Sequence, residues 1–367
     1  MMYNLNRFAA AAAGVLALAC LAPAQTWTQT GPGTYSWNDA ANWSSSVPNG
    51  NNDVAVFSTP GAGAAKTVNL SSDITLFQLQ INSSQDNPLT IGGGTIKFKN
   101  VGGGGNLSPI TIDSYPTPVL HTISSTLNFD GSNGTRTLSI GTNATLDLTG
   151  SLVNSADNLF KVTGGGAVIL SGNNAGFSIP FQVSGPGTTL TVNGNLGSSP
   201  VTVDSGATLN GNGTLTGQIV VNNGGTISGN LNVGSLTLGA GTSNYTAKVG
   251  GTPASPVNEK VTINGAITAQ AGTTLNFTLV DDGTLLPGQT YTITLLDATS
   301  ITGLTASQVT VSAANFGFGS APIVTSDSAI GNVNVTFTPV PEPATALGVA
   351  VVGLGALWLR RRRVVRA

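Results

Sequence analysis

Short alternations of apolar and small polar residues dominate the middle of the chain, and glycine or asparagine separates them every few positions. Between residues 138 and 238 a triplet that ends in an apolar residue recurs, with its last residues 23, 21, 19 and 18 positions apart. Alternation of this kind predicts β-strands, and the separators suit tight turns. A period near 20 residues is the expected length of one coil of a solenoid with two or three short strands. The triplets are Ala144-Thr145-Leu146, Ala167-Val168-Ile169, Thr188-Thr189-Leu190, Ala207-Thr208-Leu209 and Gly225-Thr226-Ile227.

The pattern changes on both sides of this region. Residues 61–137 show a degenerate form of it, and residues 261–338 hold longer, more strictly alternating runs such as Thr274–Val280. We therefore predict repeats over 61–260 and a β-rich C-terminal capping segment over 261–338. A β-sandwich is the alternative, because strand and turn spacing alone also fits it. The near-constant period favours the solenoid.

Aromatic residues gather before the repeats, in residues 25–60. Trp27, Tyr35, Trp37 and Trp43 lie there, including three of the four tryptophans of the protein. An open solenoid end exposes apolar core and unpaired strand edges, so bulky side chains are expected to cap it. The alternative is a platform on which sugar rings stack, for which Trp37 and Trp43 are the candidate glycan contacts.

Several of these segments resemble known repeats. The run from Trp37 to Trp43 is similar to the opening segment of autotransporter-associated repeat proteins, and residues 164–174 and 201–215 resemble autotransporter-associated β-strand repeats. The resemblance implies a parallel β-helix. The expected fold is thus all-β, a right-handed parallel β-helix with an aromatic N-terminal cap and a β-rich C-terminal cap.

Both ends of the sequence carry targeting patterns. Arg7 precedes an apolar run from Phe8 to Leu21, and the small residues of Ala22-Pro23-Ala24 predict a signal peptide cleaved after Ala24. Cys20, the single cysteine, is a candidate for lipidation as an alternative. Removal of the signal peptide would leave no thiol, and therefore no disulfide.

The C-terminal region, residues 339–367, has three parts. Pro341-Glu342-Pro343 precedes an apolar run from Ala344 to Leu359, and four arginines follow it: Arg360, Arg361, Arg362 and Arg363. The run predicts a transmembrane helix of about 24 Å, and the arginines predict a cytoplasmic end for it. The body of the protein is then expected outside the membrane.

The order and spacing of these elements resemble the PEP-CTERM sorting domain. That resemblance implies an exosortase-type processing enzyme as a partner, which recognises Pro341-Glu342-Pro343 and cleaves nearby. It further implies a membrane-anchored intermediate, and then a location at the cell surface or outside the cell, often together with exopolysaccharide.

Charge narrows the range of partners. Between the two targeting segments lie seven basic and fourteen acidic residues, so the exported body carries about −7. Nucleic acid is an unsuitable partner for such a surface. Only 8% of the chain is charged, and Thr, Ser, Asn and Gly supply the polar positions instead.

The sequence offers few groups for catalysis. The single histidine, His121, lies in an alternating strand and is expected to be a surface or ladder residue instead of a catalytic base. No serine lies in a Gly-x-Ser-x-Gly motif. Asp281-Asp282 is the only acidic pair, in an expected turn. Asp130, Arg136 and Asp147 could approach one another on neighbouring coils, but Asp130-Gly131-Ser132 and Asn133-Gly134 are typical turn sequences. We predict no cofactor, metal or enzymatic activity. A polysaccharide lyase or glycoside hydrolase is the alternative.

The function that fits these patterns is a non-catalytic structural or adhesive protein of the cell envelope or its polysaccharide matrix. Ladders of Asn, Thr and Ser along a rigid rod would present a weakly charged surface to glycans.

Overall fold

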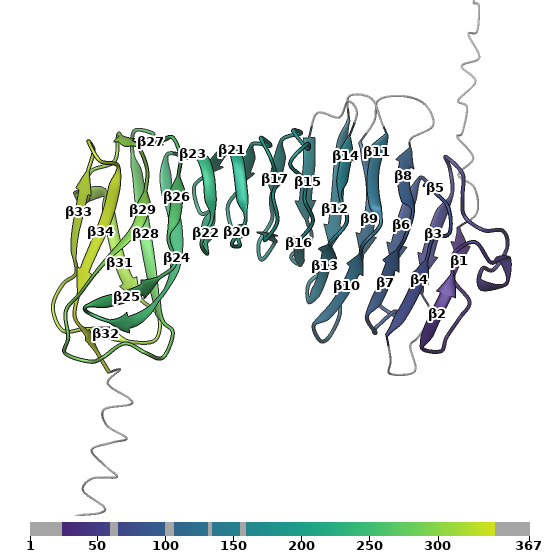
Figure 1. The fold of residues 1–367 in the computed structure, drawn as a ribbon, viewed down its shortest axis with the longest axis horizontal. Coiled ribbons are helices and arrows are strands. Elements are labelled where there is room, and N and C mark those ends of the chain that lie inside the picture. Colours follow the sequence, from purple (N-terminus) through teal and green to yellow (C-terminus); the bar gives the residue numbers. More distant parts are fainter. Residues whose placement is uncertain (1–23, 59–64, 100–105, 131–133, 155–158, 342–367) are drawn as a thin grey trace, which may run out of the picture.

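A computed structural model describes residues 24–58, 65–99, 106–130, 134–154 and 159–341. These residues form an elongated body in which short strands are stacked one behind another from the N-terminal to the C-terminal end (Figure 1). Two large sheets and two small ones contain the strands of the described part.

The larger sheet contains sixteen of the described strands. They are β1 (Gln25–Thr26), β3 (Val54–Phe57), β6 (Gln78–Ile81), β9 (Leu107–Ile112), β12 (Thr135–Ile140), β15 (Leu159–Thr163), β17 (Phe181–Val183), β19 (Val201–Val203), β21 (Thr214–Val221), β23 (Asn232–Leu238), β26 (Val261–Ile263), β27 (Ala266–Ala269), β29 (Tyr291–Asp297), β30 (Ser300–Thr302), β33 (Ile323–Asp327) and β34 (Asn332–Phe337).

The second sheet contains thirteen strands of the same described segments. They are β2 (Gly33–Ser36), β4 (Lys66–Asn69), β7 (Leu89–Gly92), β10 (Val119–Ile123), β13 (Ala144–Leu148), β16 (Ala167–Leu170), β18 (Thr189–Val192), β20 (Thr208–Asn210), β22 (Thr226–Ser228), β24 (Gly241–Thr252), β25 (Ser255–Asn258), β28 (Thr273–Asp281) and β31 (Val309–Ala313).

The small sheets complete the described part. Strands β5 (Ile74–Leu76), β8 (Thr95–Lys99), β11 (Thr126–Asp130) and β14 (Leu152–Asn154) form a third face in the N-terminal half. Strands β32 (Gly317–Phe318) and β35 (Pro339–Val340) pair at the C-terminal end. Two 3₁₀ turns, η1 (Ala40–Asn42) and η2 (Ala306–Gln308), are the helical elements among the described residues.

Parallel pairing between successive repeats builds both large sheets. Thr189 of β18 pairs with Thr208 of β20, which pairs with Thr226 of β22. Between β12 and β23 all described strand pairs of the two large sheets are parallel. The alternative fold, a β-sandwich, would have antiparallel sheets. The fold is therefore all-β with many-stranded parallel sheets, an arrangement consistent with a parallel β-helix.

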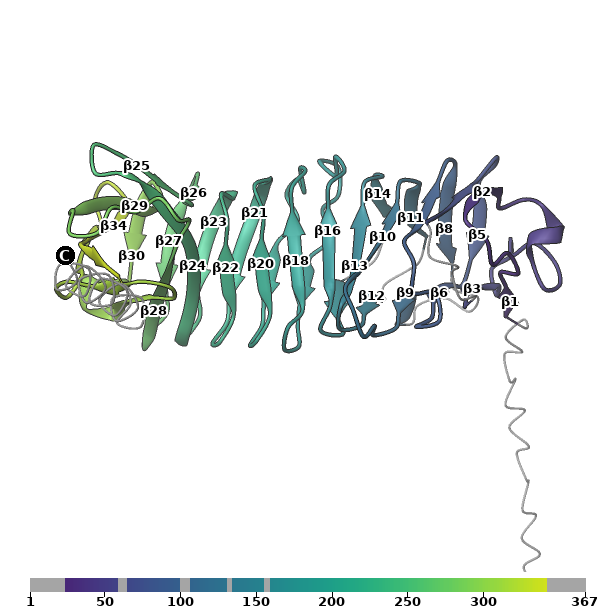
Figure 2. The same cartoon turned by 90° about the horizontal axis from the view of Figure 1, so that it is seen from below.

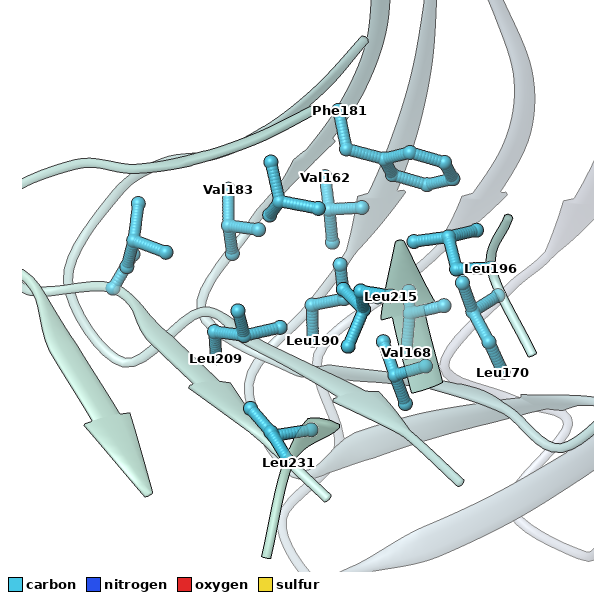
Figure 3. Close-up of a cluster of buried hydrophobic side chains, with 14 of the residues drawn as sticks. Val162, Val168, Leu170, Phe181, Val183, Leu190, Leu196, Leu209, Leu215 and Leu231 are labelled. Carbon is cyan, nitrogen blue, oxygen red and sulfur yellow. The ribbon is translucent and has the colours of Figure 1, made fainter. Parts of the chain in front are cut away.

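Alternation within each strand fills the interior. Leu190 and Leu209 are fully buried and lie in register, while the threonines beside them point outward. Figure 3 shows how Leu and Val side chains from successive strands, together with Phe181, meet between the sheets. Burial of this continuous apolar column is the main contribution to the stability of the stack.

At one repeat the inward residue is not the last residue of the triplet. Ile169 ends its triplet, but Val168 stacks on Leu146 and Leu190, and Ile169 faces outward beside Asp147. The resulting spacing between inward residues is 22 positions on both sides of Val168. Alternation alone did not decide this register, because two apolar β-branched residues are adjacent here.

The C-terminal end closes the stack in two stages. Parallel ladders continue beyond the boundary expected near residue 260, as β28 pairs with β24 and β31 pairs with β28. Antiparallel pairing then begins, because β34 reverses along β29 and β33 reverses along β34. These reversed strands cover the edge of β29 and so shield part of an end that would otherwise be open to pairing.

The targeting segments lie largely outside the described residues. The signal peptide up to Pro23 and the apolar run from Ala344 to Leu359 fall in the segments 1–23 and 342–367, which the structure does not describe. In the described part, no helix is long and apolar enough to span a bilayer.

Candidate functional site

Two outward-facing columns of polar residues follow the second sheet. On each strand the residues immediately before and after the buried apolar residue point away from the core, as period-two alternation requires. Parallel pairing places these residues in line with their counterparts on the next strand.

From β18 to β31 all the residues of both columns are Thr, Ser or Asn. We call this set the polar face. Its members are Thr189, Thr191, Thr208, Asn210, Thr226, Ser228, Asn244, Thr246, Asn276, Thr278, Thr310 and Ser312. None of them is buried.

The dimensions of the polar face follow from sheet geometry. Six neighbouring strands at about 4.8 Å give a length near 24 Å, and the two columns lie about 7 Å apart. Figure 2 shows β18, β20, β22, β24 and β28 one after another along the body, and β31 pairs with β28. Hydroxyl and amide groups both donate and accept hydrogen bonds, so the surface offers both functions at each step. It carries no charge along this length.

Hydrogen bonds between neighbouring strands order part of this face. Asn276 Nδ2 donates to Asn244 Oδ1 at 3.4 Å, and Thr310 Oγ1 donates to Asn276 Oδ1 at 3.1 Å. The hydroxyls of Thr278 and Ser312 lie 3.3 Å apart. Such ladders restrict side-chain rotation, so less rotational entropy is lost when a ligand binds.

The polar face ends at β16. Its outward positions there are Ala167 and Ile169, and on β13 Asp147 takes the column position. Asp147 Oδ1 accepts a hydrogen bond of 2.7 Å from Ser171 Oγ. The uniform surface is therefore a property of the C-terminal half of the sheet.

Trp37 and Trp43, predicted as part of the cap with glycan contact as the alternative, lie inside the N-terminal end. Trp37 is 0% exposed and Trp43 is 4% exposed, and their rings meet at 4.8 Å. Trp37 Nε1 donates to Pro48 O, and Trp43 Nε1 donates to Trp37 O. A sugar ring needs an open indole face, and neither ring provides one. The geometry fits the capping interpretation instead.

His121 is also buried, so the surface position, one of the two expected for it, is wrong. It is 0% exposed, because Leu120 and Thr122 take the outward positions of β10. Its Nδ1 accepts a hydrogen bond from Leu89 N at 3.2 Å, and its Nε2 lies 3.0 Å from Tyr115 Oη. The predicted alternation of this strand is confirmed, but His121, with its two hydrogen-bond partners, faces inward and Leu120 faces outward.

Lys66, His121, Tyr115 and Gln85 form a buried polar cluster. Lys66 is the strand partner of Leu89, whose backbone N donates to His121. Its Nζ donates to Gln85 Oε1 at 3.2 Å. Burial lowers the pKa of Lys66, although the negative charge of Asp86 acts in the opposite direction. Burial, Asp113 and Asp86 raise the pKa of Tyr115. The cluster has no open face, so its hydrogen bonds serve the interior.

Acid should therefore weaken the fold through His121. Burial lowers its pKa from the usual 6.5 to about 4, because the charged imidazolium is poorly solvated there. The unfolded chain binds this proton below about pH 6.5 and the folded chain only near pH 4. The free energy of unfolding is expected to fall by roughly 3 kcal/mol over this window.

Urea midpoints at pH 7 and pH 4.5 measure this effect. His121→Gln keeps an acceptor for Leu89 N but cannot titrate, so it should lose the His121 part of the pH dependence while other carboxylates still contribute. Equal pH dependence in both proteins would contradict the role of His121.

The remaining candidate groups for catalysis do not converge. Arg136 points into the core from β12, whereas Asp147 points outward from β13. Asp281 Oδ1 accepts hydrogen bonds from Gly283 N and Leu285 N, and Asp282 Oδ1 accepts from Thr284. Both carboxylates thus stabilise the turn after β28. No group of three potential His, Cys, Asp or Glu metal ligands occurs among the described residues.

The predicted processing residues mark the limits of the described chain. Ala24, the residue before the predicted signal cleavage, is exposed and directly precedes β1. Pro341 is exposed and follows β35, while Glu342, Pro343 and the arginines 360–363 lie outside the described residues.

One further sequence pattern indicates which residues belong to the polar face. Triplets such as Thr189-Leu190-Thr191 and Thr226-Ile227-Ser228 have a polar residue on both sides of each inward apolar residue. Their alignment across strands required the register. Neither known protein families nor curated proteins give a match for this chain.

Proposed function

We propose that this protein is an exported, surface-associated structural or adhesive protein whose polar face binds neutral, hydroxyl-rich polysaccharide. Its body is a right-handed parallel β-helix. A signal peptide directs export, and an exosortase-type enzyme processes the PEP-CTERM-like segment after a membrane-anchored intermediate. The released or retained body then contributes to the cell surface or its exopolysaccharide matrix without catalysis.

The composition of the polar face carries this proposal. Twelve hydroxyl or amide side chains lie in two straight columns without an interrupting charge. A polysaccharide chain repeats its hydroxyl groups at short, regular intervals, so it can match such a surface at several points together. Each hydrogen bond contributes about 1 kcal/mol to the binding free energy. Several such bonds along one ligand add avidity.

Charge favours a neutral polymer over an acidic one. The exported body carries an excess of acidic residues, which repels polyanions at low ionic strength. Binding through an uncharged face is expected to depend weakly on salt. Acidic exopolysaccharide should bind more weakly, and salt should reduce the difference.

Removal of three hydroxyls from the polar face should weaken binding. The variant Thr189→Val/Thr208→Val/Thr226→Val keeps strand propensity and side-chain shape but loses three donors and acceptors. We expect a loss of affinity of about tenfold or more for a neutral polysaccharide, measured by affinity electrophoresis.

A matched variant controls for general surface changes. Thr137→Val/Thr202→Val/Thr268→Val alters three outward threonines of the other large sheet and should bind like the unmodified protein. Equal affinity of all three proteins would overturn the assignment to the polar face. New reducing or unsaturated ends during incubation would instead favour a hydrolase or lyase.

A further inference from the structure

The described chain leaves the folded body at one end of the C-terminal sheets. We call this end the exit face: the tip of the β24–β25 hairpin with residues 252–257, the loop of residues 283–289, and β35. Figure 1 places β25 and β32, the partner of β35, at the same lower end of the strands.

Hydrogen bonds fix the chain on this face up to Val340. Gly288 N donates to Pro339 O at 2.8 Å, and Gly319 N donates to Thr338 O at 2.9 Å. Strand β35 pairs with β32 through Val340. Pro341 itself lines a cavity of about 220 Å³ together with Leu285, Pro287 and Phe316. The Pro-Glu-Pro motif therefore begins directly at the surface of the body.

The hairpin and the loop of the exit face are joined through Tyr291. Its hydroxyl accepts a hydrogen bond from Leu286 N at 2.8 Å and donates one to Gly251 O at 3.0 Å. Gly251 N donates to Thr284 Oγ1 at 2.7 Å. The ring of Tyr291 is buried against Phe337. The two segments are thus held beside each other on a packed support.

Each of the two segments exposes a large apolar side chain. Leu286 is 46% exposed and Val257 is 59% exposed. The carboxylates of Asp281 and Asp282, at the start of this loop, accept hydrogen bonds from the turn that carries Leu286. An apolar tip on a rigid turn is suited to the interface of a lipid bilayer.

The short connection between the exit face and the apolar run indicates that a lipid bilayer lies against this face. Only three residue steps separate Pro341 from Ala344, the first residue of the run that ends at Leu359. Such a segment spans at most about 10 Å. If the run crosses a membrane, the exit face has to lie within that distance of the bilayer.

We propose that the exit face rests on the bilayer in the membrane-anchored intermediate, with Leu286 and Val257 in the interfacial layer. This inference depends on the proposed membrane span. It holds the Pro-Glu-Pro motif at the membrane surface, where a membrane-embedded processing enzyme can reach it. The rod is then oriented by its own end instead of by a flexible linker.

Site-specific fluorescence of the full chain tests this placement. Leu286→Cys in a Cys20→Ser background is labelled with an environment-sensitive fluorophore and reconstituted into phosphatidylcholine vesicles. Ile330→Cys is the matched control: it is 60% exposed and lies in the turn before β34, at the opposite end of a strand that spans about 20 Å up to Thr338. Carbonate extraction reports separately whether the chain is inserted.

Contact predicts a blue-shifted emission at position 286 and about threefold stronger quenching by a lipid-attached quencher than at position 330. If the chain resists extraction but both labels report water equally, the exit-face contact is wrong and the membrane span stands. If carbonate releases the chain, the membrane span is wrong and the contact proposal is overturned together with it.

Discussion

Replacing Trp37 with alanine is expected to lower the free energy of unfolding by about 4 kcal/mol, one of the two largest losses that we expect. Trp37 is fully buried, and its ring lies 4.8 Å from Trp43 and 5.9 Å from Phe57. Its removal leaves a large cavity and breaks the hydrogen bond to Pro48 O. The first coils of the stack lose their cover.

The loss should be concentrated at the N-terminal end, because each coil contacts only its neighbours. Hydrogen exchange should accelerate in β1 and β3 and remain slow in β26 and β29. Trp37→Phe keeps an aromatic ring in the cluster and should recover more than half of the stability. A urea midpoint for Trp37→Ala equal to that of the unmodified protein would contradict the capping role.

Gly194→Val should destabilise the protein by about 4 kcal/mol or more. Gly150, Gly172, Gly194 and Gly213 form a ladder at one corner of successive coils. A Cβ atom on Gly194 would lie 2.1 Å from Gly172 O, and one on Gly213 would lie 2.2 Å from Gly194 O. The contact is with backbone, so no side chain can move aside. The coils would have to separate and lose ladder hydrogen bonds.

Gly176→Val provides the control, since a Cβ atom there would meet nothing within 4 Å. Its urea midpoint should stay close to that of the unmodified protein. A similar loss in both variants would point to the general cost of a β-branched residue in a turn and would argue against close backbone packing as the cause.

The candidate site was only partly accessible from the sequence. The abundance of Thr, Ser and Asn predicted polar ladders, but the polar face depends on register: Thr208 and Thr226 become neighbours only because β20 and β22 pair without a shift. The tryptophans were predicted to cap the first coil, but only their burial separates this role from a sugar platform. Burial of Trp37 and Trp43 depends on how residues 25–57 fold over the first coil.

His121 shows the same limit for a single residue. Alternation placed it correctly on a strand, but the inward position depends on hydrogen-bond partners that lie 32 and 6 positions away. Leu89 N and Tyr115 Oη supply hydrogen bonds that make a buried imidazole acceptable. Leu120 is exposed as a consequence. The alternation around residue 121 does not show which of the two faces offers these hydrogen bonds.

The sequence by itself determined the strands, their turns and the parallel repeat, because period-two alternation and a spacing near 20 residues are properties of neighbouring positions. Only the tertiary structure decided where the parallel stack ends and which side chains share a surface. Both depend on pairing between residues that lie 19 to 46 positions apart, as in Thr189–Thr208 and Tyr291–Phe337. A shift of one residue in that pairing exchanges the inner and outer faces of a strand, so the core and the binding surface are fixed together by the register.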